Sequence, residues 1–180
     1  MIGASTTDNA GTGRFPLDFI SHSPEQTRRV GGRLGQHARA GDVFLLSGPF
    51  GAGKTLFTQG LAAGLGITER VSSPSFTLIN EYAGRDAAGL PLRLYHVDLY
   101  RLETPAEIAS VGLEGIFDDP GGICAIEWPD RLGEYGALDH LLILLGPVSE
   151  TKRRLALSPR GPRYEELLSM VKAEAFGVER

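Results

Sequence analysis

The chain contains little cysteine and no long apolar run, and both shortages narrow the classes of protein to which it can belong. Its 180 residues include one cysteine, Cys124, so no internal disulfide can form. A disulfide-stabilised secreted scaffold is excluded, and we expect a reducing, cytoplasmic compartment. No apolar run approaches the roughly 20 residues that cross a bilayer. The N-terminus also lacks the basic start and apolar core of a secretory signal, so we expect no membrane association.

The chain has fewer basic than acidic residues: 18 Lys and Arg against 22 Asp and Glu, which gives a net charge of −4. This balance gives no general attraction to nucleic acid or to an anionic membrane, although a local basic patch stays open. The hydrophobic content of 42% is ordinary for a globular protein. Residues 1–14 have little to bury and are predicted to form a disordered tail, and residues 15–180 to form a single domain.

A glycine-rich motif organises the chain, since residues 48–55 (GPFGAGKT) fit G-x-x-x-x-G-K-[ST] at every fixed position. A short apolar run precedes the motif and a helical pattern follows it, which is the context of a phosphate-binding loop (P-loop). Gly51 and Gly53 let backbone N–H groups converge on phosphate oxygens, and the helix start adds its positive dipole end. The predicted nucleotide-binding residues are Phe50, Gly51, Ala52, Gly53, Lys54 and Thr55.

Two side chains of this loop have specific expected roles. Lys54 can reach the β and γ phosphates, and the Thr55 hydroxyl can take one Mg²⁺ position. The loop does not read the base, so at this point ATP and GTP both remain open.

Two acids compete for the metal-side role that P-loop enzymes give to a strand-end carboxylate. Glu127 ends the fully apolar run ICAI, whereas Asp98 ends the alternating run LRLYHV, which is expected to form a strand with one solvent-exposed face. Burial therefore favours Glu127 beside Mg²⁺, directly or through water, while Asp98 is expected to make a second metal contact, position water or hold residues 72–76. The alternatives are a capping role for Asp98 and an exposed position for Glu127.

Other side chains allow both a functional and a plainly structural interpretation. The Ser/Pro segment 72–76 either approaches the γ-phosphate or is a turn that leads into a strand. Trp128 is interpreted as a core anchor rather than a stacking surface or a partner contact, and Cys124 as a buried, inert thiol. Five arginines are candidate phosphate or tRNA contacts, but each alone is expected to be solvated: Arg85, Arg101, Arg131, Arg153 and Arg154.

Hydrophobic periodicity predicts the order of helices and strands. Ser23-Pro24 is predicted to start a helix in which Gly31, Gly32 and Gly35 permit close packing. Residues 77–82 and 92–97 are predicted to form an antiparallel hairpin, 123–126 a central strand, 141–145 with 154–157 a final pair, and 162–176 a helix. The predicted fold is an α/β, P-loop NTPase-like three-layer fold with a mostly parallel central sheet and an antiparallel hairpin.

Taken together, these motifs resemble the TsaE (YjeE) family of P-loop ATPases of bacterial tRNA threonylcarbamoyladenosine biosynthesis. The resemblance covers residues 23–157. It is based on GPFGAGKT (48–55), SSPSFTL (72–78) followed by NEY (80–82), HVDLYR (96–101), GLE (112–114) and IEWP (126–129). The P-loop alone is common to many families, whereas its combination with SPSF, HVDLYR and IEW is far more restrictive.

The resemblance implies an ATPase that is slow alone and that acts with the TsaB and TsaD proteins. That assembly would place a threonylcarbamoyl group on the adenosine beside the anticodon of tRNAs reading ANN codons, and this chain would meet tRNA through the complex. By position, Lys54 and Thr55 would hold phosphates and Mg²⁺. Glu127 matches the family's metal-side acid, and Asp98 matches the acid needed for turnover.

The chain departs from the family pattern at Pro49, Phe50, Leu56 and Ser75, and these changes bear on hydrolysis rate and nucleotide affinity. Two further functions remain open at this point. One is a P-loop kinase acting on a small molecule, with residues 98–101 orienting an acceptor hydroxyl. The other is a nucleotide-gated binding protein without meaningful turnover.

Overall fold

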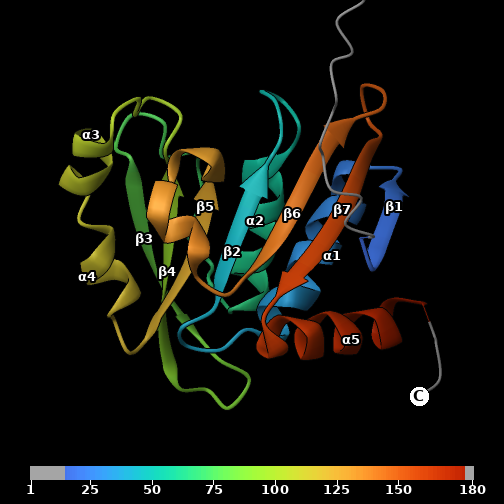
Figure 1. The fold of residues 1–180 in the computed structure, drawn as a ribbon. Helices are drawn as coiled ribbons and strands as arrows, with labels where there is room; N and C mark the ends of the chain where they lie inside the picture. Colours follow the sequence, from blue (N-terminus) through green and yellow to red (C-terminus); the bar gives the residue numbers. More distant parts are fainter. Residues whose placement is uncertain (1–14, 177–180) are drawn as a thin grey trace, which may run out of the picture.

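The computed structural model describes residues 15–176, so the predicted tail over residues 1–14 lies outside the described part. A seven-stranded sheet has the order β1-β7-β6-β2-β5-β4-β3 (Figure 1). Its strands are β1 (Leu17–Ser21), β2 (Val43–Ser47), β3 (Ile79–Arg85), β4 (Pro91–Asp98), β5 (Gly122–Glu127), β6 (His140–Pro147) and β7 (Arg153–Arg160). The helices are α1 (Pro24–His37), α2 (Lys54–Gly64), α3 (Pro105–Ser110), α4 (Leu113–Phe117) and α5 (Pro162–Phe176), with short 3₁₀ helices η1 (Pro129–Arg131) and η2 (Gly133–Ala137).

The sheet is parallel at its centre and antiparallel at both edges. Strands β6, β2, β5 and β4 run in the same direction. The predicted hairpin is formed by β3 and β4, and the predicted final strand pair by β6 and β7. The short strand β1 adds to β7 at the opposite edge. The predicted α/β fold with a mostly parallel centre is therefore confirmed.

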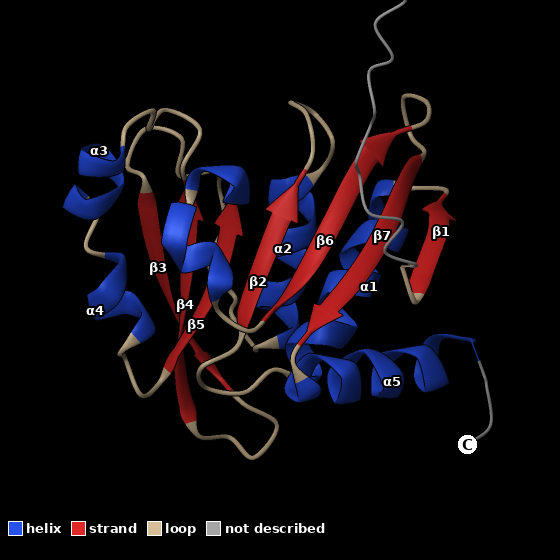
Figure 2. Cartoon of the chain, viewed as in Figure 1, coloured by secondary structure: helices blue, strands red, loops and turns tan. Residues whose placement is uncertain are grey.

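Helices cover both faces of the sheet and make three layers (Figure 2). Alternate side chains of β2 explain why, because Phe44 and Leu46 enter one hydrophobic cluster and Val43 and Leu45 enter the other. The first cluster takes its helical side chains from α1, α2 and α5, and the second takes them from α3 and α4. None of the helices within residues 15–176 has the length and apolar character needed to cross a membrane.

Glycines let α1 and α2 pack closely against each other on one face of the sheet. A Cβ atom added to Gly60 would lie 2.1 Å from the Arg28 carbonyl oxygen, and one added to Gly35 would lie 2.2 Å from that of Leu61. The same holds for Gly64 against the carbonyl oxygen of Gly32. The predicted close packing of the α1 glycines is confirmed for Gly31 and Gly35, whereas a Cβ at Gly32 would make an ordinary contact of 3.5 Å with the Gly60 carbonyl oxygen. The partner of α1 is the helix that follows the P-loop.

The expectation of a half-exposed β4 is wrong over the end of the strand that matters for the site. Only the start of β4 alternates, and every residue from Leu94 to Asp98 is buried. The reason is its place in the sheet, since β4 pairs with β3 on one side and in parallel with β5 on the other. Its end is therefore as interior as that of β5.

Candidate active site

The predicted site residues meet at one edge of the sheet, which is the upper edge in Figure 1. The loop 48–53 leaves β2 there and leads into α2, while Asp98 ends β4 and Glu127 ends β5. Because these strands are parallel, Glu127 is in register with Leu46 on one side and with Asp98 on the other. Carboxyl ends of parallel strands are where α/β proteins of this kind bind their ligands.

Two glycines of the loop are required by its path. Gly48 has φ 153° and packs so tightly that a Cβ would lie 2.2 Å from the Leu145 carbonyl oxygen. Gly53 has φ 101° and forms the left-handed N-cap of α2, where a side chain would meet Arg153. Any L side chain would be strained at these positions, and the backbone could not turn into the helix in the same way.

Lys54 is almost completely enclosed, with 5% of its surface exposed. Its Nζ donates to the carbonyl oxygens of Gly48 at 2.8 Å and Pro49 at 3.1 Å. Burial lowers the pKa of Lys54, and the charges of Glu127 and Asp98 oppose that shift. The ammonium therefore lies inside the curve of the loop, where the negative charges of Glu127 and Asp98 act on it.

Thr55 joins the loop to the strand-end acid. Its Oγ1 donates to Glu127 Oε1 at 3.1 Å, and the Glu127 side chain is buried. A hydroxyl and a carboxylate oxygen are hard ligands of the kind Mg²⁺ takes, with water and phosphate oxygens completing its shell. No cluster of three or more His, Cys, Asp or Glu side chains suited to a metal occurs among residues 15–176. Thr55 and Glu127 thus fit a Mg²⁺ ion held chiefly by a nucleotide.

Asp98 is held by the Ser/Pro segment rather than by the P-loop. Its Oδ2 accepts from Ser75 Oγ at 2.6 Å and Ser73 Oγ at 3.5 Å, and its Oδ1 accepts from the Tyr100 amide at 3.0 Å. The segment 72–76 is therefore a loop attached to the second acid. Asp98 is 3% exposed and Glu127 4%, so burial does not separate the two acids as predicted. Their hydrogen-bond partners do.

Sequence reasoning assigned no role to His96, which entered it only as the first residue of the HVDLYR motif. The His96 side chain is fully buried, and its Nε2 lies 2.9 Å from Glu127 Oε1. Side chains alternate along a strand, so His96 lies on the same face of β4 as Asp98. That period of two was the signal that could have found it.

Three aromatic rings gather over the loop. Phe50 contacts Tyr100 edge to face at a centroid distance of 4.5 Å, and Tyr100 lies 5.0 Å from Trp128. The Lys54 ammonium is 4.3 Å from the Trp128 ring centroid. The interpretation of Trp128 as a core anchor is therefore only partly right, since its partly buried ring packs against the second cluster and also contacts the site lysine.

The arginines divide differently from the prediction. Arg85, Arg101 and Arg154 are exposed, as expected, and Arg131 is partly buried. Arg153 is 8% exposed, and its Nε donates to the carbonyl oxygen of Ala52 at 3.1 Å, so its solvated interpretation is wrong. This hydrogen bond connects the start of β7 to the backbone of the P-loop.

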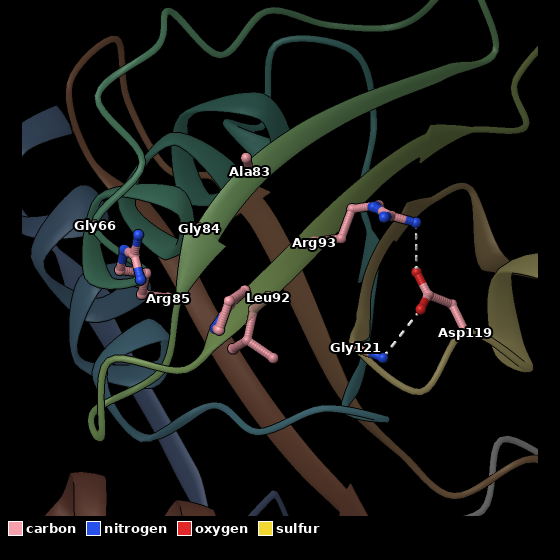
Figure 3. Close-up of a pocket in the computed structure, with 9 residues that line it drawn as sticks. Gly66, Ala83, Gly84, Arg85, Leu92, Arg93, Asp119 and Gly121 are labelled. Carbon is pink, nitrogen blue, oxygen red and sulfur yellow. Dashed lines mark hydrogen bonds and ion pairs between the residues drawn. The ribbon is translucent and has the colours of Figure 1, made fainter.

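A separate cavity of about 420 Å³ lies at the opposite end of the β3–β4 hairpin (Figure 3). It is lined by Arg85 and Arg93 among others, and Arg93 is paired with Asp119 at 3.0 Å. The length of β4 separates this cavity from Asp98 by roughly 20 Å, at about 3.3 Å per residue. None of the predicted catalytic, nucleotide-binding or metal-binding residues lines it, and of the five candidate arginines only Arg85 does.

Comparisons with known proteins agree on one family. The family model described as threonylcarbamoyl adenosine biosynthesis protein TsaE matches residues 21–155 of this chain. The tRNA threonylcarbamoyladenosine biosynthesis protein TsaE of Bacillus subtilis is 39% identical over 151 residues, which is 84% of this chain and 90% of that protein. The protein of the same name from a Nostoc species is 44% identical over 150 residues, covering 81% and 87%. The crystal structure of Bacillus subtilis YdiB superposes with a TM-score of 0.72 at 34% identity, covering 88% of this chain and 95% of that one.

Proposed function

The chain belongs to the TsaE family of threonylcarbamoyl adenosine biosynthesis proteins, and from that membership we propose that it is the Mg²⁺-dependent ATPase subunit of a tRNA-modifying assembly. The observation that carries the proposal is the bond between Thr55 Oγ1 and Glu127 Oε1. It joins a P-loop hydroxyl to a strand-end carboxylate beside a buried lysine, which is the arrangement P-loop enzymes use for Mg²⁺ and phosphates. The proposal thus has three parts: the chain binds ATP, it binds Mg²⁺ with the nucleotide, and it hydrolyses the ATP.

In the proposed reaction the loop 50–55 binds the phosphates, with the start of α2 contributing backbone N–H groups and its dipole. Lys54 neutralises charge on the β and γ phosphates. Thr55 and Glu127 would hold Mg²⁺, which when bound neutralises charge developing on the phosphate oxygens.

Asp98 is then assigned to the attacking water. The water oxygen bonds to the γ-phosphorus, the bond between that phosphorus and the β–γ bridging oxygen breaks, and ADP leaves with the electron pair. Asp98 orients the water and accepts its proton. Because Ser75 and Ser73 bond Asp98 directly, movement of the segment 72–76 would alter how the carboxylate is aimed.

The relatives' names connect this family with threonylcarbamoyladenosine in tRNA. We therefore assign the ATPase to the cycle in which TsaB and TsaD modify the adenosine beside the anticodon of tRNAs reading ANN codons. Hydrolysis would reset the complex between turnovers, and tRNA would be met through the complex. The cytosol is the proposed compartment, in keeping with a single, buried, free thiol at Cys124.

The proposal is tested by titrating the purified chain with ATP, with and without Mg²⁺, and by identifying the products. We expect binding that Mg²⁺ strengthens, and slow conversion to ADP and free phosphate. Transfer of the phosphoryl group to a nucleoside or sugar would favour a kinase instead. Absence of ATP binding by the folded chain would contradict the proposal.

A further inference from the structure

His96 occupies an unusual position for a polar side chain. It lies in the interior of β4 with none of its surface exposed. Within residues 15–176, its Nδ1 is one of two buried side-chain nitrogen or oxygen atoms that have no hydrogen-bond partner. A buried polar atom without a partner costs free energy, and an aliphatic residue would fill a strand interior without that cost. A favourable interaction of the imidazole must therefore offset this cost.

The contact made by the other ring nitrogen supplies that interaction. Nε2 lies 2.9 Å from Glu127 Oε1, across from β4 to β5. A carboxylate that binds a metal is ionised and can only accept hydrogen bonds, so in the metal-binding form of the site the proton of this contact is on Nε2. A charge-assisted bond in a fully buried place is strong and directional.

Glu127 is thereby fixed from two sides. Thr55 Oγ1 and His96 Nε2 both donate to the same oxygen, Oε1. The second oxygen, Oε2, takes neither bond and is left for water or metal. Without His96, the hydroxyl of Thr55 would be the remaining donor of this pair, and that hydroxyl is also the proposed ligand of Mg²⁺.

We propose that His96 is a positioning residue that orients the Glu127 carboxylate toward Mg²⁺. The proposal rests on the proposed ATPase function, because it assigns Glu127 its metal-side role. His96 itself touches neither nucleotide nor metal. It acts as the outer partner of a metal-binding carboxylate, a kind of contact whose loss commonly lowers metal affinity or activity about 10–100-fold.

Two substitutions of His96 separate positioning from packing. His96→Gln keeps an N–H donor at nearly the reach of Nε2, whereas His96→Leu fills the space without a donor. Tyr95→Phe is the matched control. Tyr95 lies on the same strand as His96 but on its opposite face, and the substitution removes a hydroxyl that donates to Asp119. Thermal unfolding identifies any variant that fails to fold, and the full-length chain is used throughout.

The readouts are ATP affinity with and without Mg²⁺, and kcat and KM for ATP. In His96→Leu we expect the gain in affinity from Mg²⁺ to shrink about tenfold and kcat to fall about 10–100-fold. Affinity without Mg²⁺ should stay within about threefold. KM measured with Mg²⁺ should rise by about the factor that the Mg²⁺-dependent affinity falls, because KM approaches the dissociation constant when turnover is slow. His96→Gln should recover most of both losses, and Tyr95→Phe should match the wild type.

The outcomes distinguish this proposal from the one on which it rests. A wild type that binds Mg²⁺ and ATP, together with a folded His96→Leu that keeps its Mg²⁺ response and kcat, would overturn only the role of His96. Equal losses in the Gln and Leu variants would also overturn it, because they would indicate packing. A wild type without Mg²⁺-dependent ATP binding would overturn both proposals.

Discussion

Asp98 and Glu127 are register partners at the carboxyl ends of the neighbouring parallel strands β4 and β5, and both are almost fully buried. Two carboxylates side by side in the interior are costly unless each is hydrogen bonded and a cation lies near. Lys54 supplies the nearby charge. Each acid also has its own donors, with Asp98 bonded to Ser75 and Glu127 to Thr55. These separate partners assign the two acids to different tasks.

Neutralising either acid should stop turnover without unfolding the chain. Asp98→Asn and Glu127→Gln keep size and shape but remove the charge, so we expect phosphate release to fall about 100-fold or more. Asp98→Asn should keep Mg²⁺-dependent ATP binding, whereas Glu127→Gln should weaken its Mg²⁺ dependence. Asp118→Asn, at an exposed residue near the other end of β5, is the control. Wild-type turnover in Asp98→Asn would remove Asp98 from the mechanism.

Lys54→Ala should weaken nucleotide binding itself. A hydrogen bond to a charged group contributes about 1.5–3 kcal/mol, which corresponds to a loss of affinity of roughly 10–100-fold. Isothermal titration with ATP measures the change, and Lys172→Ala on α5 controls for loss of a positive charge. Unchanged affinity in Lys54→Ala would mean that the loop does not hold the phosphates through this side chain.

The contact between α1 and α2 gives a prediction about stability. Gly60→Ala places a methyl group 2.1 Å from a backbone oxygen, so the helices must separate, and we expect a loss of about 1–3 kcal/mol. Gly115→Ala, where nothing lies within 4 Å, should leave stability unchanged or raise it by up to about 1 kcal/mol. Urea unfolding compares the two. Equal effects of both substitutions would contradict the close packing.

The single thiol, Cys124, should be unreactive toward thiol reagents in the folded protein. Burial, aided by the negative charge of Asp119, raises the pKa of Cys124 to about 12. The reactive thiolate is therefore scarce at neutral pH, and its fraction should rise only near that pKa. We expect a thiol reagent to label native protein at least about 100-fold more slowly than urea-unfolded protein. Rapid stoichiometric labelling of the native chain would contradict the buried position.

The parts of the fold carried by local pattern were predictable. The P-loop glycines, the strand before them and the apolar run of β5 follow from motif and periodicity, and the structure confirms these elements. The end of β4 was not predictable in this way, because its burial depends on pairing with β5, a strand that begins more than twenty residues later in the chain.

The same limit explains the misplaced site residues. Arg153 appeared solvated because nothing in its neighbourhood of the sequence indicates that β7 starts beside Ala52. His96 appeared ordinary because its partner Glu127 is distant in sequence. Trp128 reads as a core residue by composition, whereas its place after β5 sets its ring against Lys54. Contacts between distant segments decided each of these cases.

Phosphate release from ATP by the purified chain, alone and with TsaB and TsaD, tests the central claim most directly. The proposed function predicts slow release alone and a clear increase when both partners are present, with the increase absent in Glu127→Gln. A rate that the folded partners leave unchanged would contradict the assignment of this ATPase to the tRNA-modifying assembly.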